Sequence, residues 1–281
     1  MSATLSAAVG TGAANAAADA RTVQRLLVRA AELAGDPALH PGPVDGVVGD
    51  GTEGAIARMQ RRAGLRPDGR VDPGGYTWAR LWALLAVGDV PWGPPIDGRP
   101  AQPFVGPGAG MRSFGWRRGR GHRAHAGVDL YAPVGTPVRA VAAGVVRRAA
   151  PFYCRTDAVE VVHSGAAHGA VGGGAGDGGP GGAAPFVARY GEVDAAVTAG
   201  DRVAAGDVVG TVGQMVLGDG RPFTIGGRPA AMLHFELYDG TSEGALTDRS
   251  TRCARHTDGR PFYRRRDLVD PSAFVARALG G

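Results

Sequence analysis

The sequence predicts an α+β fold in two domains, a small three-helix domain followed by a mainly antiparallel β domain. Three observations lead to this prediction. With 281 residues, the chain exceeds the usual size of a single domain. Apolar residues at helical spacing mark the first third of the chain. Farther along, apolar and polar residues alternate, and 48 glycines with few aromatic residues favour strands joined by tight turns over a helical bundle.

The helical domain is expected over residues 19–88. In residues 22–33 the apolar side chains follow the i, i+3, i+4 spacing of a helix, and Asp19 is a suitable N-terminal cap. An Asp-Gly turn follows, after which Thr52 is expected to cap a second helix. A third helix is predicted over residues 78–87, behind a Pro-Gly-Gly turn.

The remaining boundaries follow from composition. Residues 1–18 are expected to form a flexible N-terminus, and residues 89–111, dense in proline and glycine, a semi-rigid linker. Residues 112–281 then form the β domain, with a closing helix over residues 272–279.

One segment of the predicted β domain has a composition unlike the rest. Residues 164–184 are almost all glycine and alanine and predict a hairpin loop between two strands. His163 directly precedes this loop, and His168 lies in it. Both could reach a functional site of the β domain from there, although a role in such a site is the less favoured interpretation.

Two short segments, roughly a hundred residues apart, carry side chains suited to a metal ion. One contains His125 and Asp129, and the other contains His234. Two imidazoles and a carboxylate can hold zinc and leave one tetrahedral position open for water, as in catalytic zinc sites. Water bound to zinc can act as hydroxide near neutral pH.

The local patterns place these side chains on one face. If residues 232–238 form a strand, Leu233, Phe235 and Leu237 share one face and His234 lies on the other, with Glu236. Gly127, between His125 and Asp129, would let the backbone approach whatever these two side chains hold.

These segments resemble the lysostaphin-type or LytM-like zinc metalloendopeptidases, which cut peptide cross-links in bacterial peptidoglycan. The order and spacing of the motifs agree over about residues 112–245. The matching segments are Arg123 to Leu130, Ala132 to Val138, Ala143 to Val146, Val197 to Val203, Gly206 to Gly210, and Leu233 to Glu236. The resemblance implies a β domain of the lysostaphin/LytM type, Zn²⁺ as the cofactor, and His125, Asp129 and His234 as the three metal ligands.

The chain also departs from the pattern of this family. The family has a His-x-His pair whose first histidine assists catalysis, and here that position is Met232. A further catalytic histidine follows a tyrosine in a Tyr-x-His motif, whereas this chain has Glu192 at that position, after Tyr190 and Gly191.

Two interpretations follow from these replacements. In the favoured one, Glu192 is the catalytic general base, a role that glutamate fills beside zinc in other metalloproteases. In the alternative, the domain binds zinc and cell wall without hydrolysing anything and serves as an adaptor or activator of another hydrolase. Glu236 could orient His234, or be an ordinary solvated carboxylate.

The N-terminal helices resemble the small peptidoglycan-binding domains often attached to cell-wall hydrolases. The likeness rests on the three short helices, the Asp-Gly turn, and a glutamine-rich contact expected from Val23-Gln24 and Met59-Gln60. It implies bacterial peptidoglycan as the partner. An unrelated three-helix bundle is the alternative.

The charge and hydropathy of the chain limit which partners and which location are expected for the protein. The chain has 31 Lys+Arg, all of them arginine, a formal charge of +5 and a pI near 9.7, which suits an anionic polymer such as cell wall. No nucleic-acid motif accompanies the arginines. No segment has the length and hydropathy of a membrane span, and the first 20 residues do not resemble a signal peptide.

We therefore expect the protein to act in the periplasm or on the wall of a target cell after non-classical export, through a secretion or phage-like delivery apparatus. The sequence gives little indication of whether Cys154 and Cys253 pair.

Overall fold

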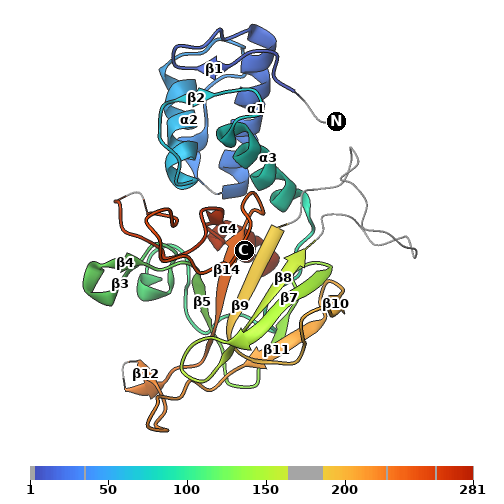
Figure 1. Cartoon of the computed structure of the whole chain (residues 1–281), viewed down its shortest axis with the longest axis vertical. Coiled ribbons are helices and arrows are strands. Elements are labelled where there is room, and N and C mark those ends of the chain that lie inside the picture. Colours follow the sequence, from blue (N-terminus) through green and yellow to red (C-terminus); the bar gives the residue numbers. More distant parts are fainter. Residues whose placement is uncertain (1–3, 35, 164–185, 226, 257, 281) are drawn as a thin grey trace.

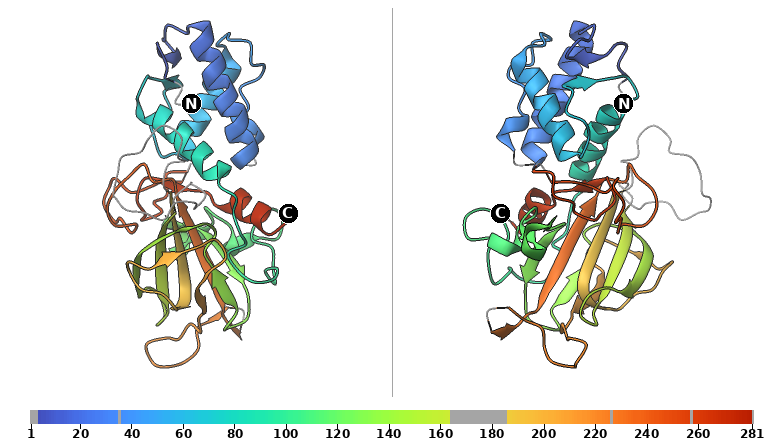
Figure 2. Two further views of the ribbon diagram at one scale, coloured as in Figure 1. Left: turned by 90° about the vertical axis from the view of Figure 1, so that its right-hand side faces the viewer. Right: turned by 60° about the vertical axis from the view of Figure 1, so that its left-hand side comes forward.

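The described chain has a helical part and a β-rich part (Figures 1 and 2). The computed structural model describes residues 4–34, 36–163, 186–225, 227–256 and 258–280. The predicted loop over residues 164–184, with His168, lies outside the described residues. The C-terminal helix lies where the two parts meet, beneath the N-terminal helices in Figure 1. The predicted α+β fold class is confirmed.

The helical part contains the three predicted helices, each longer than its apolar pattern indicates. They are α1 (Ala17–Ala34), α2 (Asp50–Arg62) and α3 (Tyr76–Asp89), with a short 3₁₀ turn η1 (Pro37–Leu39) between α1 and α2. Asp19 and Thr52 lie inside the first turns of α1 and α2 and do not cap them. Asp19 instead accepts hydrogen bonds from Ser6 and Ala7, and Thr52 accepts one from Gln24. Both side chains therefore connect separate segments of this part.

The residues before α1 are also packed, in contrast to the predicted flexible N-terminus. Leu5 and Val9 are buried, and β1 (Val9–Gly10) pairs with β2 (Arg70–Val71). The alanine-rich composition gave no sign of this pairing, because it depends on a short strand far along the chain.

Two buried glutamines hold the Asp-Gly turns of the helical part. The Gln24 amide donates to Asp45, Val47 and Thr52 and accepts from the backbone of Gly46. The Gln60 amide makes the matching set of bonds to the second turn, which are to Asp68, Arg70, Thr77 and Gly69. Since buried amides must be bonded, each glutamine fixes a turn and a helix together.

The β-rich part is a large antiparallel sheet with small attached hairpins. Strands β10, β7, β8, β9, β11 and β6 lie side by side in that order, and β14 pairs with β9, β5 and β15. Every strand pairing among the described residues is antiparallel. The bounds of the elements are η2 (Gly110–Arg112), β3 (Arg117–Arg118), η3 (Gly119–Gly121), β4 (Arg123–Ala124), β5 (Val128–Tyr131), β6 (Pro137–Arg139), β7 (Gly144–Pro151), β8 (Asp157–His163), β9 (Phe186–Ala195), β10 (Arg202–Val203), β11 (Val208–Val212), β12 (Thr224–Ile225), β13 (Arg228–Pro229), β14 (Met232–Tyr238), β15 (Leu268–Val269) and α4 (Ser272–Ala278).

Residues 91–110 pack against the sheet and do not form a free spacer. Ile96 and Phe104 are buried in its core, and the Trp92 ring stacks on Phe186 and Phe274. The proline and glycine content indicated irregular backbone, which is present, but apolar side chains within the segment attach it to the β-rich part. The domain boundaries stay a prediction.

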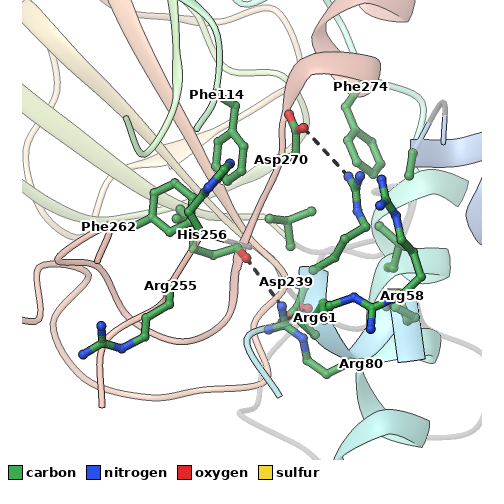
Figure 3. A pocket seen from close by; sticks show the side chains of 17 residues that line it. Arg58, Arg61, Arg80, Phe114, Asp239, Arg255, His256, Phe262, Asp270 and Phe274 are labelled. Carbon is green, nitrogen blue, oxygen red and sulfur yellow. Dashed lines mark hydrogen bonds and ion pairs between the residues drawn. The ribbon is translucent and has the colours of Figure 1, made fainter. Parts of the chain in front are cut away.

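The helical part docks on the β-rich part through buried charge as well as apolar contact. Arg80 of α3 forms an ion pair with Asp239 at 2.9 Å, and both side chains are buried. Arg277 of α4 donates to the carbonyl oxygen of Leu33. Beside the ion pair lies a cavity of about 210 Å³, in which arginines of α2 and α3 come close to Asp239 and Asp270 (Figure 3).

Among the described helices, none has both the length and the apolar character needed to cross a membrane. Both cysteines are free: Cys154 is half-buried and Cys253 is buried.

The docking contact can be tested with Arg80→Met. This substitution leaves Asp239 buried without its partner, and burial already raises the pKa of Asp239. We expect the free energy of unfolding to fall by about 3 kcal/mol in urea titrations. Arg221→Ala is the control, since its pair with Asp219 is 78% and 48% exposed and, screened by solvent, should contribute little to stability. Equal losses in both variants would contradict the interpretation.

Candidate metal centre

Three side chains meet at the pairing of β5 with β14. Asp129 and His234 face each other directly in this antiparallel register, and His125 lies in the turn before β5. The His234 Nδ1 atom lies 2.8 Å from Asp129 Oδ1, and His125 Nε2 lies 3.0 Å from the same oxygen. The two imidazole nitrogens are 3.2 Å apart. The structure thus brings together all three predicted ligands, and they are buried.

Gly127 makes this approach possible. A Cβ atom at Gly127 would lie 2.2 Å from the carbonyl oxygen of Phe235 and 3.1 Å from Cε1 of His234. Any other residue would therefore push β5 and β14 apart at the point where the three ligand atoms meet.

The outer nitrogen of each imidazole has a hydrogen-bond acceptor. His125 Nδ1 lies 2.8 Å from the carbonyl oxygen of Ser113, and His234 Nε2 lies 2.9 Å from Glu236 Oε1. If each outer nitrogen carries the proton, both inner nitrogens present lone pairs toward Asp129 Oδ1. Two lone pairs and a carboxylate oxygen at this spacing are a donor set that fits a zinc ion, with a position left for water or substrate.

The electrostatics of the cluster favour positive charge between these atoms. Although burial opposes it, hydrogen bonds to Asp129 and Glu236 raise the pKa of His234 to about 9. Although burial opposes this too, His125 and His234 hold the pKa of Asp129 well below its usual range. Burial lowers the pKa of His125, so this imidazole stays neutral and able to ligate.

Glu236 is the hub of a buried charge network beneath His234. It accepts hydrogen bonds from Arg189 at 3.0 Å and Arg264 at 2.7 Å, and Tyr238 donates to it as well. These two arginines outweigh the effect of burial and hold the pKa of Glu236 well below its usual range. Because Glu236 is fully buried and bonded, it is not a solvated strand carboxylate. It orients His234.

Glu192 lies on β9, which pairs with β14 beside His234. Its neighbour Gly191 pairs with His234, and Glu192 has a positive φ of 64°. Together with His125, Asp129 and His234 it lines a cavity of about 630 Å³. Its Oε2 atom is buried and has no hydrogen-bond partner among the described residues. Burial, followed by the charge of Asp129, raises the pKa of Glu192 to about 7.

Neither Met232 nor His163 belongs to the cluster of His125, Asp129 and His234. Met232 is buried in a small cluster with Met215 and Ala230 and also lines the cavity. His163 lies at the far end of β8 from Ala158, the residue that pairs with Gly191. It is bonded to Tyr190 and to the backbone of Ala143, and it does not line the cavity.

Sequence reasoning missed the arginines that support the site. Arg118 donates to Asp129 Oδ2 at 2.6 Å, and Arg189 is held between Glu236 and Glu160. A signal for Arg189 was available, since it directly follows the apolar residues Phe186, Val187 and Ala188, and a buried arginine requires carboxylate partners.

The helical part matches a known family. Residues 17–81 match the family model "Putative peptidoglycan binding domain". The resemblance seen in the sequence of this part is confirmed. No curated protein sequence matches the chain.

The chain is also similar to solved peptidase structures. The catalytic domain of lysostaphin from Staphylococcus simulans is 18% identical, with 58% of this chain and 87% of that chain covered and a TM-score of 0.34. LytU is 19% identical, with 66% and 86% covered and a TM-score of 0.33. A zinc-containing peptidase from Vibrio cholerae is 18% identical, with 53% and 30% covered and a TM-score of 0.29. Similarity at this level does not assign residues; their roles must come from the side chains of this chain.

Glu236→Gln tests the orienting role of this carboxylate. The amide keeps the shape but loses the charge that favours a proton on His234 Nε2. We expect zinc affinity, measured by competition with a chromophoric chelator, to fall about 10- to 100-fold.

The control for this measurement is Glu243→Gln, at an exposed position outside the network. Its affinity should equal that of the original protein. Unchanged affinity in Glu236→Gln, with the fold intact by circular dichroism, would contradict the role of Glu236.

His163 gives a prediction about acid stability. Burial lowers its pKa to about 4 in the folded protein, from a usual value of 6.5. Below pH 6.5 the unfolded chain binds a proton that the folded chain does not, so stability falls between pH 6.5 and 4 and the loss is complete below that range. We expect this loss, about 3 kcal/mol, to be absent from the pH dependence of unfolding in His163→Gln. The same acid dependence in both proteins would contradict it.

Proposed function

We propose that the chain is a zinc-dependent peptidase that hydrolyses amide bonds in the stem peptides or cross-bridges of bacterial peptidoglycan. The observation that carries the proposal is the convergence of His125, Asp129 and His234 in one cavity with the unpartnered carboxylate of Glu192. This donor set and an adjacent base are the parts that metal-assisted hydrolysis requires.

The three ligands would be held ready by their own contacts. Ser113 and Glu236 would fix the tautomers of the two imidazoles, and Arg118 would orient Asp129 through its hydrogen bond to Oδ2. Zinc, when bound, supplies a Lewis acid that polarises the scissile carbonyl and lowers the pKa of water.

Glu192 would move the proton. Its Oε2 atom takes a proton from the attacking water and can return it to the amine that leaves. A pKa near 7 suits this exchange, because the group is neither fully protonated nor a weak base at neutral pH. The unpartnered oxygen and the location of Glu192 in the cavity support this role.

The helical part would bring the enzyme to its substrate. The family match at residues 17–81 supports binding to peptidoglycan. The buried Arg80 to Asp239 contact would hold this part in a fixed orientation to the cavity. We place the protein in the periplasm or on the wall of a target cell, since that is where peptidoglycan is found, and its route there would be a secretion or phage-like delivery apparatus.

A second candidate function is an inactive adaptor that binds zinc and peptidoglycan. Met232 favours it, because a buried thioether can neither donate nor accept a proton at the position it occupies in the cavity. The adaptor would bind purified sacculi and release no peptide fragments. The peptidase would release soluble muropeptides, and a chelator would stop the release.

Glu192→Gln tests the proposed base. The amide cannot accept the proton, so release of muropeptides from sacculi should fall by about 10²- to 10⁴-fold. Zinc content should stay the same, because Glu192 is not among the three clustered ligand residues.

Asp194→Asn is the matched control, since Asp194 lies on the same strand but does not line the cavity. It should retain full activity. Full activity in Glu192→Gln would remove Glu192 from the mechanism, whereas loss of zinc in this variant would make it a ligand.

A further inference from the structure

The wall of the metal cavity carries more arginine than the protein itself neutralises. Six arginines and three carboxylates line it, and Glu236 behind the wall pairs with two of these arginines, so an excess of two positive charges remains. The arginines are Arg118, Arg123, Arg148, Arg189, Arg249 and Arg264, and the carboxylates are Asp129, Glu160 and Glu192. A bound zinc ion would add further positive charge.

Three of these arginines are paired within the protein. Arg118 is bonded to Asp129, Arg264 to Glu236, and Arg189 to both Glu160 and Glu236. They hold the site together, and their charges are already matched.

Arg123 and Arg249 are not matched in this way. Neither guanidinium has a carboxylate within ion-pair distance among the residues that the structure describes, and both belong to exposed residues at the cavity. Arg148, the sixth arginine, also has no such carboxylate among the described residues, but it is not among the main charges that lower the pKa of Arg123. We call Arg123 and Arg249 the arginine rim. Arg123 belongs to β4, and Arg249 lies in the segment between β14 and β15.

The rim lies close to other positive charges. Partial burial, together with the neighbouring Arg118, Arg264 and Arg249, lowers the pKa of Arg123. Arg123 and Arg249 have no counter-charge of their own, so an anion bound beside them relieves the repulsion that they share. Guanidinium groups bind planar carboxylates in particular, through two parallel hydrogen bonds.

We propose that the arginine rim binds a free carboxylate of the peptide substrate near the bond that is cut. This inference rests on the proposed function and narrows the substrate class to anionic peptides. Peptides whose carboxylates are amidated, or bridges without acidic groups, would then be poorer substrates. The rim would position the peptide, whereas His125, Asp129, His234 and Glu192 would carry out the chemistry.

The test uses two cross-linked stem-peptide dimers that differ in one respect. One has free carboxylates, and in the other they are carboxamides. Binding is measured by calorimetry on the full-length Glu192→Gln protein loaded with zinc, so that no turnover interferes. Turnover of both peptides is measured on the protein with Glu192 intact.

We expect the free-carboxylate peptide to bind about tenfold more tightly than the amidated peptide, since hydrogen bonds between charged groups are the stronger ones. In the Arg123→Gln/Arg249→Gln protein the ratio of the two affinities should fall toward one. In turnover, the loss for the free-carboxylate peptide should appear in KM more than in kcat. Arg123→Lys/Arg249→Lys should restore part of it. Arg252→Gln is the control, because Arg252 is exposed on the same segment as Arg249 but does not line the cavity.

Different results would contradict the arginine rim and the proposed peptidase activity. Equal affinity for both peptides would overturn the proposal that the rim binds a carboxylate. A preference that survives in the double Gln variant would also overturn it and would assign the preference to the metal. A preference for the free carboxylate without turnover of either peptide would overturn the proposed peptidase and leave the rim as a carboxylate-binding site.

Discussion

The pairing of β5 with β14 is the constraint on which the site depends. Its register sets Asp129 opposite His234, and a shift by one residue would turn both side chains to the other face. Gly127 allows the strands to come close, and Leu233, Phe235 and Leu237 anchor the opposite face of β14 in the core. The apolar face of one strand therefore fixes the geometry of the polar face.

Buried ion pairs compensate the charge on the polar face of β14. His234, Glu236 and Tyr238 follow one another along β14, and Arg189 and Arg264 supply the compensating positive groups. A buried carboxylate without partners would be protonated, and Glu236 could then not fix the tautomer of His234. The network is thus a condition for the proposed metal site as much as for the fold.

Much of the fold and of the candidate site was predictable from particular residues. Alternation along residues 232–238 gave the two faces of β14. The residue types in two short segments, together with their resemblance to a known family, gave the cluster of His125, Asp129 and His234. Apolar periodicity gave α1 to α3, although their first turns were misplaced because Asp19 and Thr52 bond to distant segments instead of capping.

The contacts that could not be predicted join segments far apart in the sequence. The β1 to β2 ribbon, the packing of residues 91–110 and the Arg80 to Asp239 pair leave no periodic pattern. The burial of Arg189 and the unmatched charge of Arg123 also depend on neighbours brought together by folding. Local propensity and alternation carry no information about such partners.

The most direct test of the account is a crystal structure of the zinc-loaded protein with anomalous scattering recorded at the zinc edge. We predict a single peak at about 2.0 to 2.2 Å from His125 Nε2, Asp129 Oδ1 and His234 Nδ1. A peak ligated by other residues, or none at this position in protein that binds zinc in solution, would contradict the account.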